Sequence, residues 1–107
     1  MIHVLATVLI KEECLPQALD CYRYLVPLVL EKEAGCIEYT PTMDHDLGLA
    51  NQNRTPTRIL VTERWQSEED FRAHLGMPHC VEFRARIQPC LAEGITVTVT
   101  RPALELR

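Results

Sequence analysis

The sequence predicts an α+β protein in which four strands form one sheet and helices cover one face of that sheet. Two runs of alternating or β-branched residues, at 2–10 and 95–100, predict strands at the two ends of the chain. Between them, apolar residues at helical spacing alternate with two further strand candidates. The resulting order of strand–helix–strand–strand–helix–strand is that of a ferredoxin-like sandwich, and we expect a single domain over residues 1–107.

The first strand and the first helix follow directly from the opening third of the chain. Residues 2–10 are rich in β-branched side chains, and every even position is apolar. A helix is expected over residues 16–33, where apolar residues recur at helical spacing. Pro16 suits its first turn, and Gly35 is placed to stop it.

The middle of the chain predicts two strands joined by a long polar connection. Residues 36–44 and 58–65 alternate between apolar and polar side chains. The connection over residues 44–57 is longer than most loops of compact domains, which indicates a functional loop or one that packs on a partner.

The last part of the chain predicts two consecutive helices and a final strand. Ser67 is a suitable N-cap, and the acidic run 68–70 favours a first helical turn. Pro78 begins a second helical stretch that we expect to end at Gly94. Residues 95–100 alternate between apolar and hydroxyl-bearing side chains, so they predict a strand with one apolar face.

A sheet covered on only one face by its own helices leaves its other face open. We assign Ile2, Val4, Val8 and Leu60 to this open face, together with one side of residues 95–100. Each such side chain contributes about 1.5–3 kcal/mol when buried, so a handful outweighs an association entropy of about 4–15 kcal/mol. The sequence therefore predicts a homodimer that buries the same patch on both subunits.

The bulk composition excludes several classes of partner and location. A formal net charge of −4 without a basic patch argues against nucleic-acid binding. The apolar opening over residues 1–10 is too short to span a bilayer, so no membrane role is expected. This opening also lacks the features of a signal peptide, and we expect a cytoplasmic protein.

The five cysteines are odd in number and form no Cys-x-x-Cys pair. This pattern argues against a disulfide framework and against a zinc ribbon. Cys36 follows Gly35 and has the chemistry of a nucleophile, but no histidine partner is placed beside it by the sequence. We therefore interpret the cysteines as small apolar fillers.

The strongest functional signal lies where the strand 58–65 joins the helix that follows it. Trp65 is the single tryptophan of the chain, and His74 and His79 lie around the end of that helix. One large aromatic and two groups that titrate near neutral pH indicate a pocket with acid–base capability. Core packing by Trp65 and architectural hydrogen bonds from the two histidines remain alternative interpretations.

The same segment resembles the hallmark of the antibiotic biosynthesis monooxygenase domain family. The similarity rests on Glu63-x-Trp65-x-Ser67-x-x-x-Phe71-x-x-His74-Leu75-x-x-Pro78-His79, and on residues 26–39. It is nearest to the bacterial probable quinol monooxygenases. It implies a dimeric α+β barrel with one pocket per subunit, between sheet and helices. Haem-degrading relatives carry an asparagine on the first strand, and residues 4–7 read Val-Leu-Ala-Thr, which argues against haem cleavage.

No cofactor is expected. The four glycines are scattered, and no Gly-x-Gly follows a strand, so nothing predicts a flavin or nicotinamide site. No metal is expected either, because His74 and His79 are not spaced as a helical i, i+4 ligand pair. An oxygenase with these properties would use the electrons of its own substrate.

A hydroquinone or related polyphenolic aromatic fits that requirement, because its phenolate can reduce dioxygen by single-electron steps. We expect a small aromatic substrate and dioxygen as the reactants. His74 or His79 is the candidate base. Trp65 and Tyr39 are candidates for the walls of an aromatic slot.

Three further residues are candidates for substrate binding. His3 or Thr7 on the first strand has the hydrogen-bonding groups to contact the ring oxygens. Glu63 occupies an inward position of its strand, where pairing with an arginine and a part in the chemistry are equally compatible with the sequence.

Two other functions remain open on the sequence. The same histidines would suit an isomerase of a small carbonyl or phosphorylated metabolite, with Arg54 and Arg58 as anion clamps. The chain would also suit a non-catalytic dimer that binds a small apolar molecule.

Overall fold

The computed structural model describes residues 1–104 and confirms the predicted α+β architecture. The regular elements are β1 (Ile2–Leu9), α1 (Leu15–Lys32), β2 (Cys36–Met43), β3 (Arg58–Trp65), α2 (Glu68–Leu75), α3 (Pro78–Ile87) and β4 (Thr96–Thr100), with short 3₁₀ turns at Glu12–Cys14 and Gln88–Cys90. The last helix ends earlier than the sequence predicts, at Ile87 rather than at Gly94. Pro89 explains this early end, because it lacks the N–H that would continue the helix.

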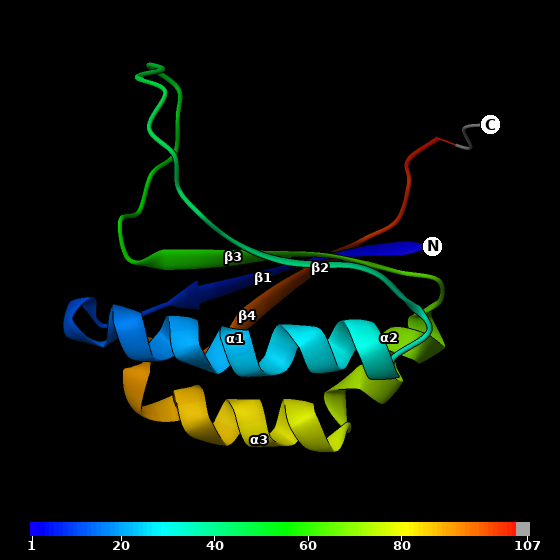
Figure 1. Cartoon of the computed structure of the whole chain (residues 1–107). Helices are drawn as coiled ribbons and strands as arrows, with labels where there is room; N and C mark the ends of the chain where they lie inside the picture. Colours follow the sequence, from blue (N-terminus) through cyan, green and yellow to red (C-terminus); the bar gives the residue numbers. More distant parts are fainter. Residues whose placement is uncertain (105–107) are drawn as a thin grey trace.

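The four strands form one antiparallel sheet in the order β2-β3-β1-β4. Figure 1 shows α1, α2 and α3 together on one side of this sheet. The connection over residues 44–57 and the segment over residues 101–104 rise on the other side. The molecule therefore has two layers, with a hydrophobic core between sheet and helices and an outer sheet face without helices.

The strand register identifies which side chains lie between sheet and helices. Val4 pairs with Glu63 and Val8 pairs with Ile59, and all four are buried in this layer. Our assignment of Val4, Val8 and Ile2 to the open face was therefore wrong. Ile2 pairs with the core residue Trp65, so it lies on the helix-covered side too. The reason is the pleat, in which residues directly opposite each other share a face.

The outer face carries the odd positions of β1 and the even positions of β3. His3 pairs with Arg64, and Thr7 pairs with Leu60. Leu60 is thus assigned correctly to this face. Arg64 also donates a 2.9 Å hydrogen bond to the Glu38 carboxylate of β2. The outer face is therefore a mixture of apolar, hydroxyl-bearing and charged side chains.

The segment that follows α1 lies close to the start of α2 at Gly35. The Gly35 carbonyl accepts a 2.8 Å hydrogen bond from the Gln66 N–H. A Cβ at Gly35 would overlap the Asp70 carboxyl group at the start of α2, so the close approach requires glycine. Ser67 caps α2 as predicted, because its hydroxyl oxygen accepts from the Asp70 N–H at 3.1 Å.

Within residues 1–104, the helices are too short or too polar to cross a membrane.

Candidate functional site

A narrow cavity of about 80 Å³ lies between the sheet and the helices. Its walls come from all four strands or their ends and from all three helices. Its polar lining consists of Tyr22, Tyr39, Glu63, His74, Cys80 and Arg84. Leu75 and Val97 also line the cavity and are 45% and 52% exposed, so its mouth lies between α2 and the β4 edge. The cavity therefore combines apolar walls, titratable groups and a route to solvent.

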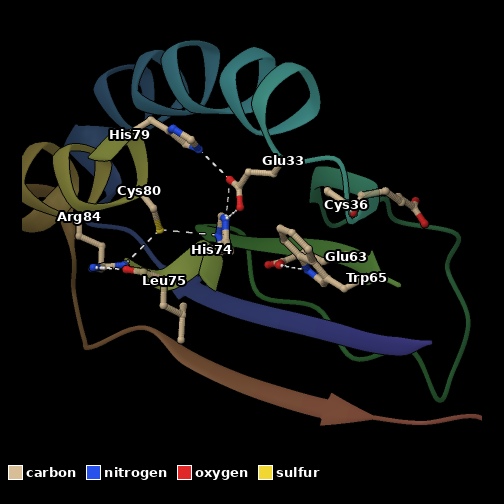
Figure 2. A network of polar contacts seen from close by, with 10 residues as sticks. Glu33, Cys36, Glu63, Trp65, His74, Leu75, His79, Cys80 and Arg84 are labelled. Carbon is tan, nitrogen blue, oxygen red and sulfur yellow. Dashed lines mark hydrogen bonds and ion pairs between the residues drawn. The ribbon is translucent and has the colours of Figure 1, made fainter. Parts of the chain in front are cut away.

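A buried carboxylate joins two histidines beside this cavity. Glu33, which directly follows α1, lies 2.9 Å from His74 Nδ1 and 2.6 Å from His79 Nε2. The three side chains are all buried, and Figure 2 shows the Glu33 carboxylate between the two rings. Three helices are thus linked by one network, since His74 belongs to α2 and His79 to α3.

The contacts of His74 orient both of its nitrogens. Nδ1 lies next to the Glu33 carboxylate, which accepts a hydrogen bond and so favours the proton on Nδ1. Burial lowers the pKa of His74, and this effect outweighs the opposing effect of Glu33. His74 is therefore neutral at pH 7, and its Nε2 lone pair is available as a base.

The partner of His74 Nε2 is a thiol. Cys80 Sγ lies 3.6 Å from Nε2 and also accepts a 3.0 Å hydrogen bond from Arg84 Nη1. The second nitrogen of the guanidinium donates to the Leu75 carbonyl at 2.8 Å, which holds Arg84 in place (Figure 2). A chain of contacts thus runs from Glu33 through His74 to Cys80 and Arg84.

A second buried carboxylate, Glu63, faces the cavity from β3. Its Oε1 accepts a 3.0 Å hydrogen bond from the Trp65 indole N–H. Burial raises the pKa of Glu63 to about 7, although the hydrogen bond from Trp65 acts in the opposite direction. Glu63 can therefore accept or donate a proton near neutral pH.

Aromatic rings surround His74 on several sides. The ring centroids of Trp65, Tyr39 and Phe71 lie 4.8, 5.4 and 6.1 Å from that of His74. Burial raises the pKa of Tyr39, so its hydroxyl stays protonated at neutral pH. These rings exclude water from the base and offer flat apolar surface.

The structure brings together five of the seven site residues that the sequence predicts. His74, Glu63 and Tyr39 line the cavity directly. Trp65 is completely buried, where it packs against His74 and hydrogen bonds Glu63. His79 contacts Glu33 and lines a separate surface hollow with Lys32 and Met77.

His3 and Thr7 lie elsewhere. Their register positions put them on the outer face of the sheet, opposite the helices and the cavity. They were selected for their hydrogen-bonding groups, but the cavity-facing residues of this strand are Ala6 and Val8.

The two arginines considered as anion clamps also lie away from the cavity. Arg58 is bound to Asp44 at 2.8 Å, and Arg54 is bound to Asp46 at 2.6 Å. These pairs belong to the connection that rises from the outer face of the sheet (Figure 1).

Three residues of the network were missed by the sequence analysis. Glu33 had been assigned only to the end of a helix, Cys80 had been interpreted as a filler, and Arg84 had no assigned role. Glu33 and His74 are 41 positions apart, so no local pattern signals their contact. The position of Cys80 six residues after His74, across a helix break, was the one usable signal.

Comparison with known proteins identifies the class of protein to which this fold and cavity belong. Residues 1–86 match the family model described as antibiotic biosynthesis monooxygenase, so the chain belongs to that family. The probable quinol monooxygenase YgiN of Escherichia coli (strain K12) is 31% identical over 86 residues, which are 80% of this chain and 81% of that protein. Family membership and this relative support a monooxygenase-type function on a small molecule.

Solved structures share the same fold. One named as an antibiotic biosynthesis monooxygenase, from Nitrosomonas europaea, superposes with a TM-score of 0.83 at 16% identity, covering 97% of this chain and 100% of that one. A conserved protein from Methanosarcina mazei Go1 has a TM-score of 0.80 at 24% identity, covering 94% and 90%. At these identities the similarity defines the fold alone.

Proposed function

We propose that this protein is a cofactor-independent monooxygenase that oxygenates a quinol or a related polyphenolic aromatic. The observation that carries the proposal is a neutral histidine, His74, which lines the cavity and whose Nδ1 is held by Glu33 while its Nε2 has the weakly bonding Cys80 thiol as a partner, at 3.6 Å. The quinol substrate class is supported by the 31% identity to a probable quinol monooxygenase. The small volume of the cavity, about 80 Å³, favours a compact substrate.

The reaction begins with a proton transfer. A quinol hydroxyl gives its proton to His74 Nε2, and the resulting phenolate passes one electron to dioxygen. The two radicals combine to form a carbon–oxygen bond, and the hydroperoxide then loses water to give a hydroxyquinone. Quinol and dioxygen thus yield hydroxyquinone and water, with all four electrons supplied by the substrate.

Glu63 serves the second half of this reaction. Its pKa of about 7 lets it donate a proton to the departing oxygen and recover it afterwards. The Trp65 N–H fixes the orientation of its carboxyl group. His79 acts from behind the cavity, because it orients Glu33 rather than touching the substrate.

The test is oxygen uptake with a panel of substituted hydroquinones and naphthohydroquinones. We expect enzyme-dependent uptake, and we expect His74→Gln to lower kcat by about a hundredfold because the base is lost. His45→Gln is the matched control, since His45 is exposed on the long connection and should retain wild-type activity. Ligand binding without oxygen uptake across the panel would instead indicate a binding protein.

We also propose that the working unit is a homodimer formed through the outer face of the sheet. This face has no helical cover, and the nearby connection carries Leu47 and Leu49 with 67% and 56% exposure. Light scattering should give twice the mass of one chain. Leu60→Lys, on the outer face, should shift the protein toward monomer, and a wild-type monomer would contradict the proposal.

A further inference from the structure

We propose that Cys80 is a nucleophile that adds covalently to quinones in the cavity, with His74 as its base and Glu33 as the group that orients the base. The choice of electrophile rests on the proposed function, whose product is a quinone. The contacts of the Cys80 thiol with His74 and Arg84 do not depend on that function. The activity would make the cavity a site of quinone capture as well as of quinol oxidation.

The geometry is that of an activated nucleophile. Cys80 Sγ lies 3.6 Å from His74 Nε2, and His74 Nδ1 lies 2.9 Å from the Glu33 carboxylate. A nucleophile within reach of a base, and a base oriented by a third group, is the arrangement by which proteins generate thiolates on demand. Because Glu33 occupies Nδ1, the nitrogen facing the thiol is the one with the free lone pair.

A cation also contacts the sulfur. Arg84 Nη1 donates to Cys80 Sγ at 3.0 Å, so a negative charge formed there would be paired at once. Cys80 lies in the first turn of α3, where the backbone N–H groups also favour negative charge. Burial raises the pKa of the Cys80 thiol against the opposing effect of Arg84, so deprotonation needs the nearby base.

Cys36 provides a contrast within the same chain. It is half-buried, and its thiol donates to the Glu38 carbonyl at 3.4 Å. Burial and the neighbouring carboxylates Glu33 and Glu63 raise its pKa to about 12. Burial and the same two carboxylates also raise the pKa of Cys80, so the difference between the two thiols is that Cys80 contacts a base, His74, and a cation, Arg84.

The sulfur is also placed where a quinone would bind. Cys80, His74 and Arg84 line the same cavity as Glu63, and its mouth is bordered by the exposed Leu75. A ring bound in this cavity would share it with the Cys80 side chain. The Arg84 guanidinium is in position to donate a hydrogen bond to a quinone oxygen.

The chemical step is a conjugate addition. The thiol proton moves to His74 Nε2 as the sulfur lone pair forms a bond to a ring carbon, and the electrons of the ring double bond move to one carbonyl oxygen. That oxygen takes the proton from His74. Loss of the ring proton to the second oxygen restores aromaticity, so the product is a hydroquinone thioether that contains every atom of both reactants. No external oxidant or reductant is needed.

The test uses limiting 1,4-benzoquinone under anaerobic conditions, followed by mass spectrometry of peptides that contain each cysteine. Reactivity governed by exposure alone would modify the half-buried Cys14, Cys21 and Cys36 before the buried Cys80. We expect the reverse order, with Cys80 gaining the mass of one quinone about tenfold faster than the others. Modification of Cys80 at or below the rate of the others would overturn the proposal, and this comparison needs no variant.

Substitutions show whether the rate of modification at Cys80 depends on the base His74 or on the exposure of the thiol. His74→Gln should slow modification of Cys80 by about a hundredfold and leave the rates at Cys14 and Cys21 unchanged. His45→Gln should change none of these rates. An unchanged Cys80 rate in a folded His74→Gln protein would overturn the role of the base. Because no oxygen is present, failure here is distinct from failure of quinol oxygenation, which is measured by oxygen uptake.

Discussion

Glu33 and Glu63 are identical side chains, buried in the same protein to 8% and 4% exposure, and they have different surroundings. Glu33 lies between two histidine rings, each within hydrogen-bonding distance of its carboxylate. Glu63 has one neutral partner, the Trp65 indole, and otherwise faces the apolar cavity.

The difference shows how two buried carboxylates in one small core can have separate roles. A carboxylate with two ring partners is a fixed point that orients His74. Glu63 has a single neutral donor, and burial together with the nearby Glu33 carboxylate raises its pKa to about 7 against the opposing effect of the Trp65 hydrogen bond. The two buried carboxylates therefore differ in their partners: Glu33 positions His74, whereas Glu63 titrates near neutral pH.

The largest effect that we expect from the difference between Glu33 and Glu63 is on the free energy of unfolding. Glu33→Gln should lower the free energy of unfolding by about 3 kcal/mol, because both buried ring nitrogens contact Oε2 and a neutral amide removes the charge that strengthens these two hydrogen bonds. Urea denaturation at neutral pH measures the change. The identical substitution at the other site, Glu63→Gln, is the control and should cost far less at that pH. Equal losses at the two sites would contradict the distinction.

A somewhat smaller effect is expected in the pH dependence of stability. The folded protein keeps the Glu63 proton up to a pH of about 7, whereas the unfolded chain releases it near the ordinary value of 4.5. Between these values the folded state binds more protons, so stability contributed by the protonated group is lost as the pH rises. The loss should reach roughly 2–3 kcal/mol above pH 7.

Subtracting the pH profile of Glu63→Gln from that of the wild type isolates this contribution. His74 also titrates, but it is common to both proteins and cancels. A flat difference between about pH 5 and pH 8 would mean that Glu63 has an ordinary pKa in the folded protein.

The smallest effect concerns the one hydrogen bond of Glu63. Trp65→Phe removes the indole N–H that stabilises the ionised carboxylate, so the midpoint of the stability decline should move upward by about one pH unit. Phe71→Leu changes packing against Trp65 without removing this donor, and its midpoint should stay at the wild-type value. A midpoint unchanged in Trp65→Phe would show that the hydrogen bond is unimportant for the titration.

The fold was largely predictable because its signals are local. Alternation along β3 correctly put Glu63 and Trp65 on one face, and Ser67 correctly marked the start of α2. The faces of different strands were not predictable in the same way. Leu60 and Val8 were assigned to one face, but Leu60 pairs with Thr7, and a shift of one residue in register reverses the face.

The candidate site was predictable only in part, because some of its contacts are local in sequence and others join distant segments. Trp65 and His74 belong to one continuous segment, so their proximity followed from sequence. Glu33 reaches His74 only after α1 and α2 have packed together, and its sequence neighbourhood contains no sign of this contact. Cys80 acquires a base where α2 meets α3 and a cation from Arg84, one turn along the same helix, which turns an apparent filler into a candidate nucleophile.

The contact between Gly35 and Asp70 sets a limit on how this chain can vary. Gly35 is two residues from Glu33, and Asp70 is one helical turn from His74, so the contact fixes the spacing between carboxylate and imidazole. Any side chain at position 35 would act as a wedge under α2 and widen the gap between them. The absence of a side chain at this one position therefore keeps the Glu33 carboxylate within hydrogen-bonding distance of His74.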